Sequence, residues 1–260
     1  MGRHNTCVKK AQAAARRART FKVLYFGHSH IRRFGELIKN KEAYWSEDTT
    51  ALLLDTLNEV QPGNPNKRYD SQLGYPNSDH DFRAVEGFTT PEIAAQLEAA
   101  LDTPRDIQVI YAGDNDQRHC PKAADAAARV FRTVLKYLLC YAGPTILCGL
   151  LPRLGDGRYC KWAGEVNEKL LEMVMKHNKA PHERRIIWLQ HYKCMKMDAA
   201  PKGEPYGNKK IHEGVLRWKR MPDGTWERVD DTIHMGYWAL GKFYCSMSEA
   251  LKHALDYLIF

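Results

Sequence analysis

The chain has 260 residues, of which 44% are hydrophobic and 27% are charged, and its formal net charge is +8. A chain of this length can bury a substantial core, and its composition excludes a largely disordered protein. No apolar run approaches the roughly 20 residues that a membrane-spanning helix needs. The composition therefore favours a globular protein of enzyme size.

Residues 1–20 form a basic arm in which cationic side chains lie among alanines. These cations are Lys9, Lys10, Arg16, Arg17 and Arg19. The arm lacks the apolar stretch of a secretory signal, so we expect an intracellular protein, cytoplasmic or nuclear. The segment 9–19 can bind an anionic partner such as nucleic acid, or it can be a solvated tail.

From residue 21 onward, apolar runs alternate with amphipathic stretches. This pattern is typical of an α/β protein in which helices cover a mostly parallel sheet. The expected strands cover 22–26, 82–85, 107–111, 144–148 and 185–189, and the expected helices cover 30–39, 91–101, 122–141, 163–178 and about 236–257. The clearest helical period lies between Ala124 and Tyr141 and predicts a core-facing stripe. It comprises Ala127, Val130, Phe131, Val134, Leu135, Leu138 and Leu139.

Two segments interrupt this alternation and are interpreted as insertions into a single domain over 21–260. Residues 40–81 are dense in turn-forming residues and predict a long excursion over the sheet. Residues 191–230 contain LRWKRMPDGTWERV, two alternating stretches around a Pro-Asp-Gly turn, which predicts a β-hairpin.

The first expected strand runs into YFGHSH at residues 25–30. Ser29 is thereby placed at the carboxyl end of that strand, where open α/β sheets build their ligand sites. Gly27 permits a tight turn, and the next helix directs its N-terminal amides toward any charge that forms there. Because serine is also a common helix N-cap, this stretch fits either a capped turn or a turn that presents a nucleophile.

The next two strands also end in residues suited to chemistry. After the second strand, Gly87 can expose its backbone N–H to a ligand or simply form a turn. After the third strand, the Asn115 side-chain amide can donate to a substrate oxygen, and Asp116 can hold the loop in place. The alternative for this stretch is an Asx-rich turn before the next helix.

A fourth candidate lies near the C-terminus, where Asp231 precedes His234 by three residues. A serine hydroxyl is a poor nucleophile until a base removes its proton, and histidine suits that task near neutral pH. An aspartate at this spacing can reach the other ring nitrogen and stabilise the charged imidazole.

In this order, the four segments resemble the sequence blocks of the SGNH hydrolases, also called GDSL-like esterases, from about residue 22 to 257. The resemblance implies a flavodoxin-like three-layer α/β/α sandwich around a mostly parallel five-stranded sheet of order 2-1-3-4-5. It also implies a set of site residues. Ser29 is the expected nucleophile, His234 and Asp231 the base and its partner, Ser29, Gly87 and Asn115 the oxyanion hole, and Gly27, His28, Gly113 and Asp116 the supporting residues.

One position departs from the family pattern, whose first block usually reads Gly-Asp-Ser. Here His28 replaces the aspartate, which puts the local hydrogen bonding and the substrate preference in question. We expect His28 and His30 to flank Ser29 on opposite sides and, because adjacent residues in a turn point apart, to point away from it and leave the role of base to His234.

The activity implied by the resemblance is a serine esterase that hydrolyses short-chain acyl or acetyl esters without a cofactor. Acetylated sugars and lipids are alternative substrates, and tryptophans could offer them flat surfaces or could simply pack in the fold. These are Trp45, Trp162, Trp218, Trp226 and Trp238. A different alternative is a nucleic-acid-associated protein of a retrotransposon, because esterase-like domains of this superfamily also occur in such elements. Its binding would depend steeply on salt.

Metal chemistry is not expected. The seven cysteines form no CxxC pair, which favours reduced thiols. His28, His30, His119 and Cys120 also lack the paired spacing of a structural zinc site.

Overall fold

A computed structural model describes residues 18–39, 73–141, 143–179, 186–189, 216–230 and 233–259. The basic arm up to residue 17, residues 40–72 of the first expected insertion and residues 191–215 of the second lie outside this described part. Asp231 also lies outside it.

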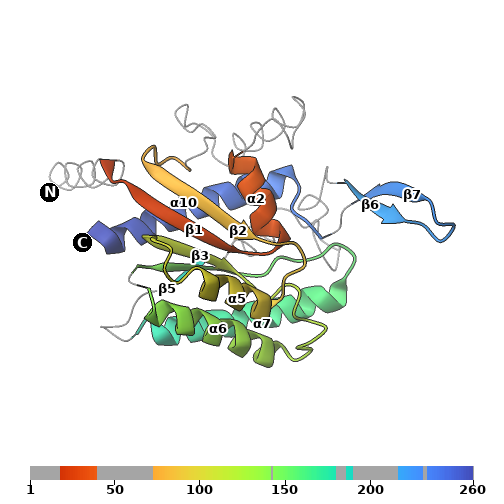
Figure 1. The fold of residues 1–260 in the computed structure, drawn as a ribbon. Coiled ribbons are helices and arrows are strands. Elements are labelled where there is room, and N and C mark those ends of the chain that lie inside the picture. Colours follow the sequence, from red (N-terminus) through yellow and green to blue (C-terminus); the bar gives the residue numbers. More distant parts are fainter. Residues whose placement is uncertain are drawn as a thin grey trace, which may run out of the picture.

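Five strands form one sheet of order β2-β1-β3-β4-β5, and every neighbouring pair is parallel (Figure 1). The strands are β1 (Phe21–Gly27), β2 (Ser78–Ala84), β3 (Ile107–Tyr111), β4 (Thr145–Cys148) and β5 (Ile186–Leu189). β1, β3 and β4 are mostly apolar and buried, as expected for parallel strands covered on both faces. The predicted order is confirmed.

Helices cover both faces of this sheet. On one face, α2 (Ser29–Lys39) packs on β1 and β2, while α10 (Tyr237–Ile259) packs on β4 and β5. α5 (Thr90–Ala99), α6 (Ala123–Leu139) and α7 (Gly157–His177) form the layer on the other face (Figure 1). Phe34 of α2 meets Phe243 of α10 edge to face, with ring centroids 4.8 Å apart. The predicted three-layer sandwich is therefore confirmed.

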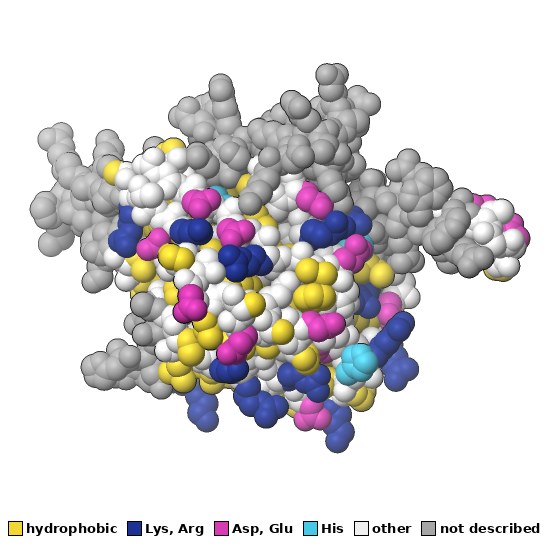
Figure 2. Space-filling model, in the orientation of Figure 1, with side chains coloured by type: hydrophobic (Ala, Val, Ile, Leu, Met, Phe, Trp, Pro, Cys, Tyr) yellow, Lys and Arg dark blue, Asp and Glu magenta, His cyan; other side chains and the backbone are white. Residues whose placement is uncertain are grey.

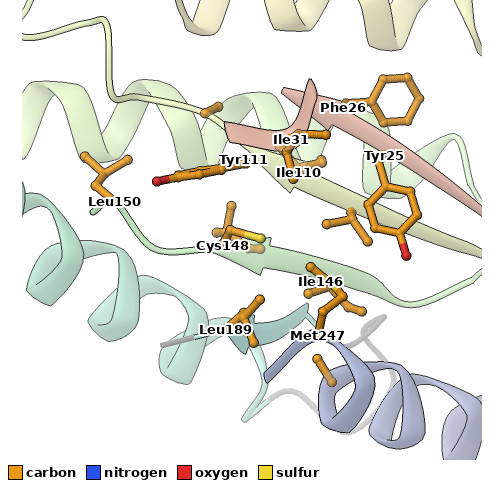
Figure 3. Packing of buried hydrophobic residues seen from close by; sticks show 14 of the residues in the cluster. Tyr25, Phe26, Ile31, Ile110, Tyr111, Ile146, Cys148, Leu150, Leu189 and Met247 are labelled. Atoms are coloured by element: carbon orange, nitrogen blue, oxygen red, sulfur yellow. The ribbon is translucent and has the colours of Figure 1, made fainter. Parts of the chain in front are cut away.

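The core lies where the two helical layers press on the sheet. Figure 3 shows side chains of the central strands packed together with Met247 of α10. α6 buries a stripe at three- and four-residue spacings, as predicted, but the stripe is rotated toward its alanines: Ala126 is buried, whereas Leu139 is 81% exposed. The inclusion of Leu139 in the core face was wrong.

Two element boundaries differ from the predictions because polar residues begin the elements. β2 starts at Ser78, so Ser78–Asp81 belong to the sheet and not to the excursion expected over 40–81. α7 starts at Gly157, where the Asp156 carboxylate caps the helix by accepting a bond from the Tyr159 backbone N at 2.8 Å.

The predicted hairpin is confirmed as the antiparallel pair β6 (Leu216–Arg220) and β7 (Trp226–Asp230). In its turn, the Asp223 carboxylate accepts bonds from the backbone and side chain of Thr225. Figure 1 shows the hairpin extending away from the sheet. Within the described ranges, no helix combines the length and apolar character needed to cross a bilayer.

The molecular surface is mixed in charge on the face that Figure 2 shows. Lys and Arg side chains are most frequent along its lower edge, and acidic side chains are interspersed over the rest.

Candidate active site

Ser29 is the first residue of α2 and lies at the carboxyl edge of the sheet, as predicted. The turn before it requires glycine at residue 27. A Cβ there would lie 2.9 Å from the Tyr111 carbonyl oxygen and 2.9 Å from Ile31 Cγ1, which is too close to backbone for any larger residue. Ser29 itself is 6% exposed.

The loop that follows β2 begins beside this turn. Gly27 is in register with Ala84, and the backbone N of Val85 donates to the Gly27 carbonyl at 3.2 Å. Gly87 follows with a φ of +78°, a conformation that favours glycine, and a Cβ there would have no atom within 4 Å. Gly87 is thus exposed on a loop that starts beside the turn before Ser29.

The loop that follows β3 is bonded to the same region. Gly27 is also in register with Tyr111, the last residue of β3. Asn115 Nδ2 donates to the Phe88 carbonyl at 3.0 Å, and the buried Asp116 accepts from the Thr90 backbone N at 2.9 Å. These two bonds join the loop of Asn115 to the loop of Gly87, and Asp116 holds the loop in place as expected.

Gly113 allows this second loop to turn. Its φ is +113°, and a Cβ would lie 3.2 Å from both Leu150 Cδ2 and Val130 Cγ2. The Asn115 amide keeps one hydrogen beyond its bond to Phe88, because a carboxamide nitrogen carries two.

His28 does not point away from Ser29, so this expectation was wrong. Its ring packs over Tyr111 with centroids 4.8 Å apart, and Nδ1 lies 3.5 Å from Ser29 Oγ. The buried carboxylate of Asp114 accounts for this orientation, because it lies 3.5 Å from His28 Nε2 on the far side of the ring.

Asp114 is the centre of a buried polar cluster that the sequence reasoning missed. Its Oδ2 accepts from His30 Nε2 at 3.2 Å and from the Tyr111 hydroxyl at 3.3 Å, and its Oδ1 accepts from the Tyr159 hydroxyl at 2.7 Å. Its backbone carbonyl accepts from Arg153 at 2.9 Å. The available signal was an aspartate three residues past a buried strand, opposite two histidines of the neighbouring strand end.

Burial sets the protonation of this cluster. Desolvation lowers the pKa of His28 and brings the pKa of His30 to about 3, even though Asp114 opposes both shifts. Burial alone would raise the pKa of Asp114, but the hydrogen bond from His30 and the nearby His28 and Arg153 lower it below its ordinary range. At neutral pH the cluster is one carboxylate with two neutral imidazoles.

His234 reaches the same cluster from the other end of the chain. It is half-buried just before α10, and its ring meets that of His30 edge to face with centroids 5.6 Å apart. Segments two hundred residues apart are thus brought to one edge of the sheet. The pairing of His234 with Ser29, and with Asp231, stays a prediction.

Of the five tryptophans proposed as flat surfaces, only the side chain of Trp162 is described, and it does not join this site. Trp162 is buried, and its indole N donates to the Cys120 carbonyl at 3.1 Å, so it packs in the fold. Trp45 and the side chains of Trp218, Trp226 and Trp238 are outside the described part. Among the described residues, no three His, Cys, Asp or Glu side chains are grouped to bind a metal ion.

No protein-family model matches the sequence, and no curated protein does either. Solved structures do match over nearly the whole chain. A GDSL-like lipase from Bacteroides thetaiotaomicron aligns with a TM-score of 0.53 at 15% identity, covering 98% of each chain. A lipase/acylhydrolase from Enterococcus faecalis aligns with a TM-score of 0.52 at 14% identity, covering 90% of this chain and 96% of that one. The chain has the fold of the GDSL-like acylhydrolases.

A third similar structure is the catalytic domain of peptidoglycan O-acetyltransferase A from Streptococcus pneumoniae, with a methylsulfonyl adduct. It aligns with a TM-score of 0.50 at 14% identity, covering 91% of this chain and 95% of that one. The predicted resemblance to the GDSL-like fold is confirmed at the level of architecture.

Proposed function

We propose that this protein is a serine ester hydrolase that acts on short-chain acyl or acetyl esters. The observation that carries the proposal is the position of Ser29 at the carboxyl edge of the sheet. Its hydroxyl oxygen lies 3.5 Å from Nδ1 of His28. The same edge holds the loop of Gly87, the loop of Asn115 and the ring of His234. These are the four segments that a GDSL-like esterase uses.

In the proposed mechanism, His234 takes the proton of the Ser29 hydroxyl as the oxygen attacks the ester carbonyl. Asp231 would orient His234 and stabilise the imidazolium that forms. His234 then returns the proton to the leaving alcohol, and water hydrolyses the acyl-enzyme by the same steps in reverse order.

The oxyanion would be stabilised by the backbone N–H groups of Ser29 and Gly87 and by the side-chain amide of Asn115. The first amides of an α-helix have no partner within the helix and carry its positive dipole end, so the start of α2 suits a developing negative charge. The bond from Asn115 to Phe88 supports this role because it holds the Asn115 amide beside the Gly87 loop.

We favour a small acyl group because Ser29 is only 6% exposed. The likeness to an O-acetyltransferase domain is compatible with acetyl esters, on a sugar or on another alcohol. A lipid ester would need a long acyl channel, and we rank it second.

The test is hydrolysis of nitrophenyl esters of increasing acyl length by the wild-type chain and by Ser29→Ala. We expect the acetyl ester to be cleaved fastest and Ser29→Ala to lose the activity. Ser246→Ala changes a half-buried serine of α10 and is the matched control, expected to retain wild-type turnover. A sulfonyl fluoride should label Ser29, as detected by peptide mass spectrometry. Undiminished hydrolysis by Ser29→Ala would rule the proposal out.

A further inference from the structure

The imidazole of His28 lies between the hydroxyl of Ser29 and a buried carboxylate. Its Nδ1 is 3.5 Å from Ser29 Oγ, and its Nε2 is 3.5 Å from Asp114 Oδ2. We infer that Ser29, His28 and Asp114 form a second catalytic triad, in which His28 serves as a general base for Ser29 alongside His234. This inference rests on the proposed ester hydrolase function and names a further catalytic residue for it.

The burial of His28 supports this role. The side chain is 1% exposed, and its Nε2 has no hydrogen bond among the described residues. A buried nitrogen without a hydrogen bond is unfavourable. A small rotation of the ring that shortens the contact between Nε2 and Asp114 is therefore favoured. Catalytic hydrogen bonds are commonly long before substrate binds.

Asp114 is held firmly enough to serve as the carboxylate that orients His28. The Tyr159 hydroxyl donates to its other carboxylate oxygen at 2.7 Å, and Arg153 donates to its backbone carbonyl at 2.9 Å. The guanidinium of Arg153 also stacks over the Tyr159 ring at 3.9 Å, which fixes both donors. An ionised carboxylate in this position stabilises a positive charge on the imidazole that faces it.

The His28 tautomer that donates a hydrogen bond to Asp114 is also the one that catalysis requires. When Nε2–H donates to Asp114, the lone pair of Nδ1 is directed to the Ser29 hydroxyl. Burial also lowers the pKa of His28, so the ring is neutral near neutral pH and its Nδ1 lone pair is not occupied by a proton in this tautomer.

The inferred reaction moves one proton between Ser29, His28 and the leaving alcohol. Ser29 Oγ forms a bond to the ester carbonyl carbon while its proton moves to His28 Nδ1, and the carbonyl π pair moves to the oxygen. When the tetrahedral intermediate collapses, the bond to the alcohol breaks and the leaving oxygen takes the proton from Nδ1. Water then adds by the same path and releases the carboxylic acid. The Nε2 proton stays between His28 and Asp114 throughout.

His30 provides a matched comparison in the same cluster. It is as buried as His28 and binds the same carboxylate oxygen at 3.2 Å, but its ring stacks on Tyr111 with an interplanar angle of 22°. Ser29 Oγ is paired with His28, and no such bond to His30 is seen among the described residues. A loss that merely reflects damage to the cluster should therefore follow substitution of either histidine, whereas loss of a base should follow substitution of His28 alone.

The experiment measures hydrolysis of nitrophenyl acetate by variants made on the His234→Ala background, with Ser29→Ala as the floor. We expect His234→Ala to keep hydrolysis above that floor. Adding His28→Asn should lower the remainder to the floor, by about 10², at the lower end of the usual range for a general base. Adding Asp114→Asn should do the same, and adding His30→Asn should not.

A second substitution of His28 distinguishes loss of the base from misfolding of the His28→Asn variant. His28→Gln retains an amide that can reach Asp114 but offers no base to Ser29, so it should give the same loss with a wild-type melting temperature. A His234→Ala variant at the Ser29→Ala floor would overturn the inference, and so would a residual activity that persists in both His28 variants. Wild-type hydrolysis by Ser29→Ala would instead refute the proposed function itself.

Discussion

Asn115 and Phe88 are joined by a hydrogen bond of 3.0 Å between the side-chain amide of one and the backbone carbonyl of the other. The bond crosses between the loops after β3 and β2, so it couples two of the three proposed oxyanion donors. A change at Asn115 should therefore remove one donor and loosen a second.

For Asn115→Ala we expect kcat to fall by about 10² to 10³, the usual cost of losing one oxyanion donor. Steady-state hydrolysis of an acetyl ester checks this. Asn178→Ala is the control, because its amide bonds both backbone groups of Ile186 at the opposite, amino edge of the sheet. It should lower stability and leave kcat unchanged. Equal kcat in Asn115→Ala and the wild type would contradict the assignment.

Gly27→Ala should destabilise the fold and reduce activity together. The added methyl group would lie 2.9 Å from the Tyr111 carbonyl oxygen, so β1 and β3 would have to separate at the turn before Ser29. We expect a loss of about 1–3 kcal/mol in the free energy of unfolding, as for other overpacked sites, measured by urea titration.

Gly164→Ala is the matched control for that substitution. It lies inside α7, and a Cβ there would have no atom within 4 Å. Alanine should raise the free energy of unfolding by about 0.5–1 kcal/mol, because glycine is unfavourable within a helix. A Gly27→Ala variant as stable as Gly164→Ala would show that the turn is looser than its geometry indicates.

Stability should fall as the pH is lowered from about 6.5 toward 3. The pKa of His30 is about 3 in the folded chain, against an ordinary value of about 6.5, so the unfolded chain binds the extra proton in this window. The lowered pKa of Asp114 acts in the same direction at the acidic end. The groups that face His30 are Asp114, His28 and His234. The loss should be on the order of a few kcal/mol.

Urea midpoints at several pH values measure this dependence. His30→Asn should give a shallower slope than the wild type, because it removes the group that is kept neutral by burial. His253→Asn, which removes an exposed imidazole from α10, should keep the wild-type slope. Parallel slopes for the wild type and His30→Asn would contradict the buried state assigned to His30.

Tyr159→Phe should disturb the cluster without touching either histidine. It removes the 2.7 Å hydrogen bond from the Tyr159 hydroxyl to Asp114 Oδ1, which is the shortest hydrogen bond to that buried carboxylate. We expect a loss of roughly 1–3 kcal/mol in the free energy of unfolding, and a rise in the pKa of Asp114. Tyr137→Phe is the control, since the Tyr137 hydroxyl bonds to the exposed Glu98 and should contribute less.

The sequence was sufficient to predict the elements that depend on local pattern. The apolar runs of β1, β3 and β4, the helical period of α6 and the Pro-Asp-Gly turn of the hairpin are all encoded within a few neighbouring residues. β2 was placed too late because its first residues, Ser78 to Asp81, are polar and pair only with β1 at the edge of the sheet. Such a strand has no apolar signal to find.

The site was predictable at the level of which segments meet, but not of how their side chains lie. Ser29 and Asn115 were placed by their positions at strand ends. The orientation of His28 depends on Asp114, which comes from another strand and shows no periodicity of its own. A buried acid that reorients two imidazoles is a tertiary effect, and no local rule contains it.

The position of the site on β1 and β3 also affects how the molecule opens. Both strands have a neighbour on each side, whereas β2 and β5 form the two margins of the sheet. In native-state amide exchange, margins open through small local fluctuations, and interior strands open only in larger ones. The backbones of β1 and β3, which end just before Ser29 and Asp114, should thus be among the slowest to exchange, so both residues would be anchored to the most stable part of the sheet while its margins open locally.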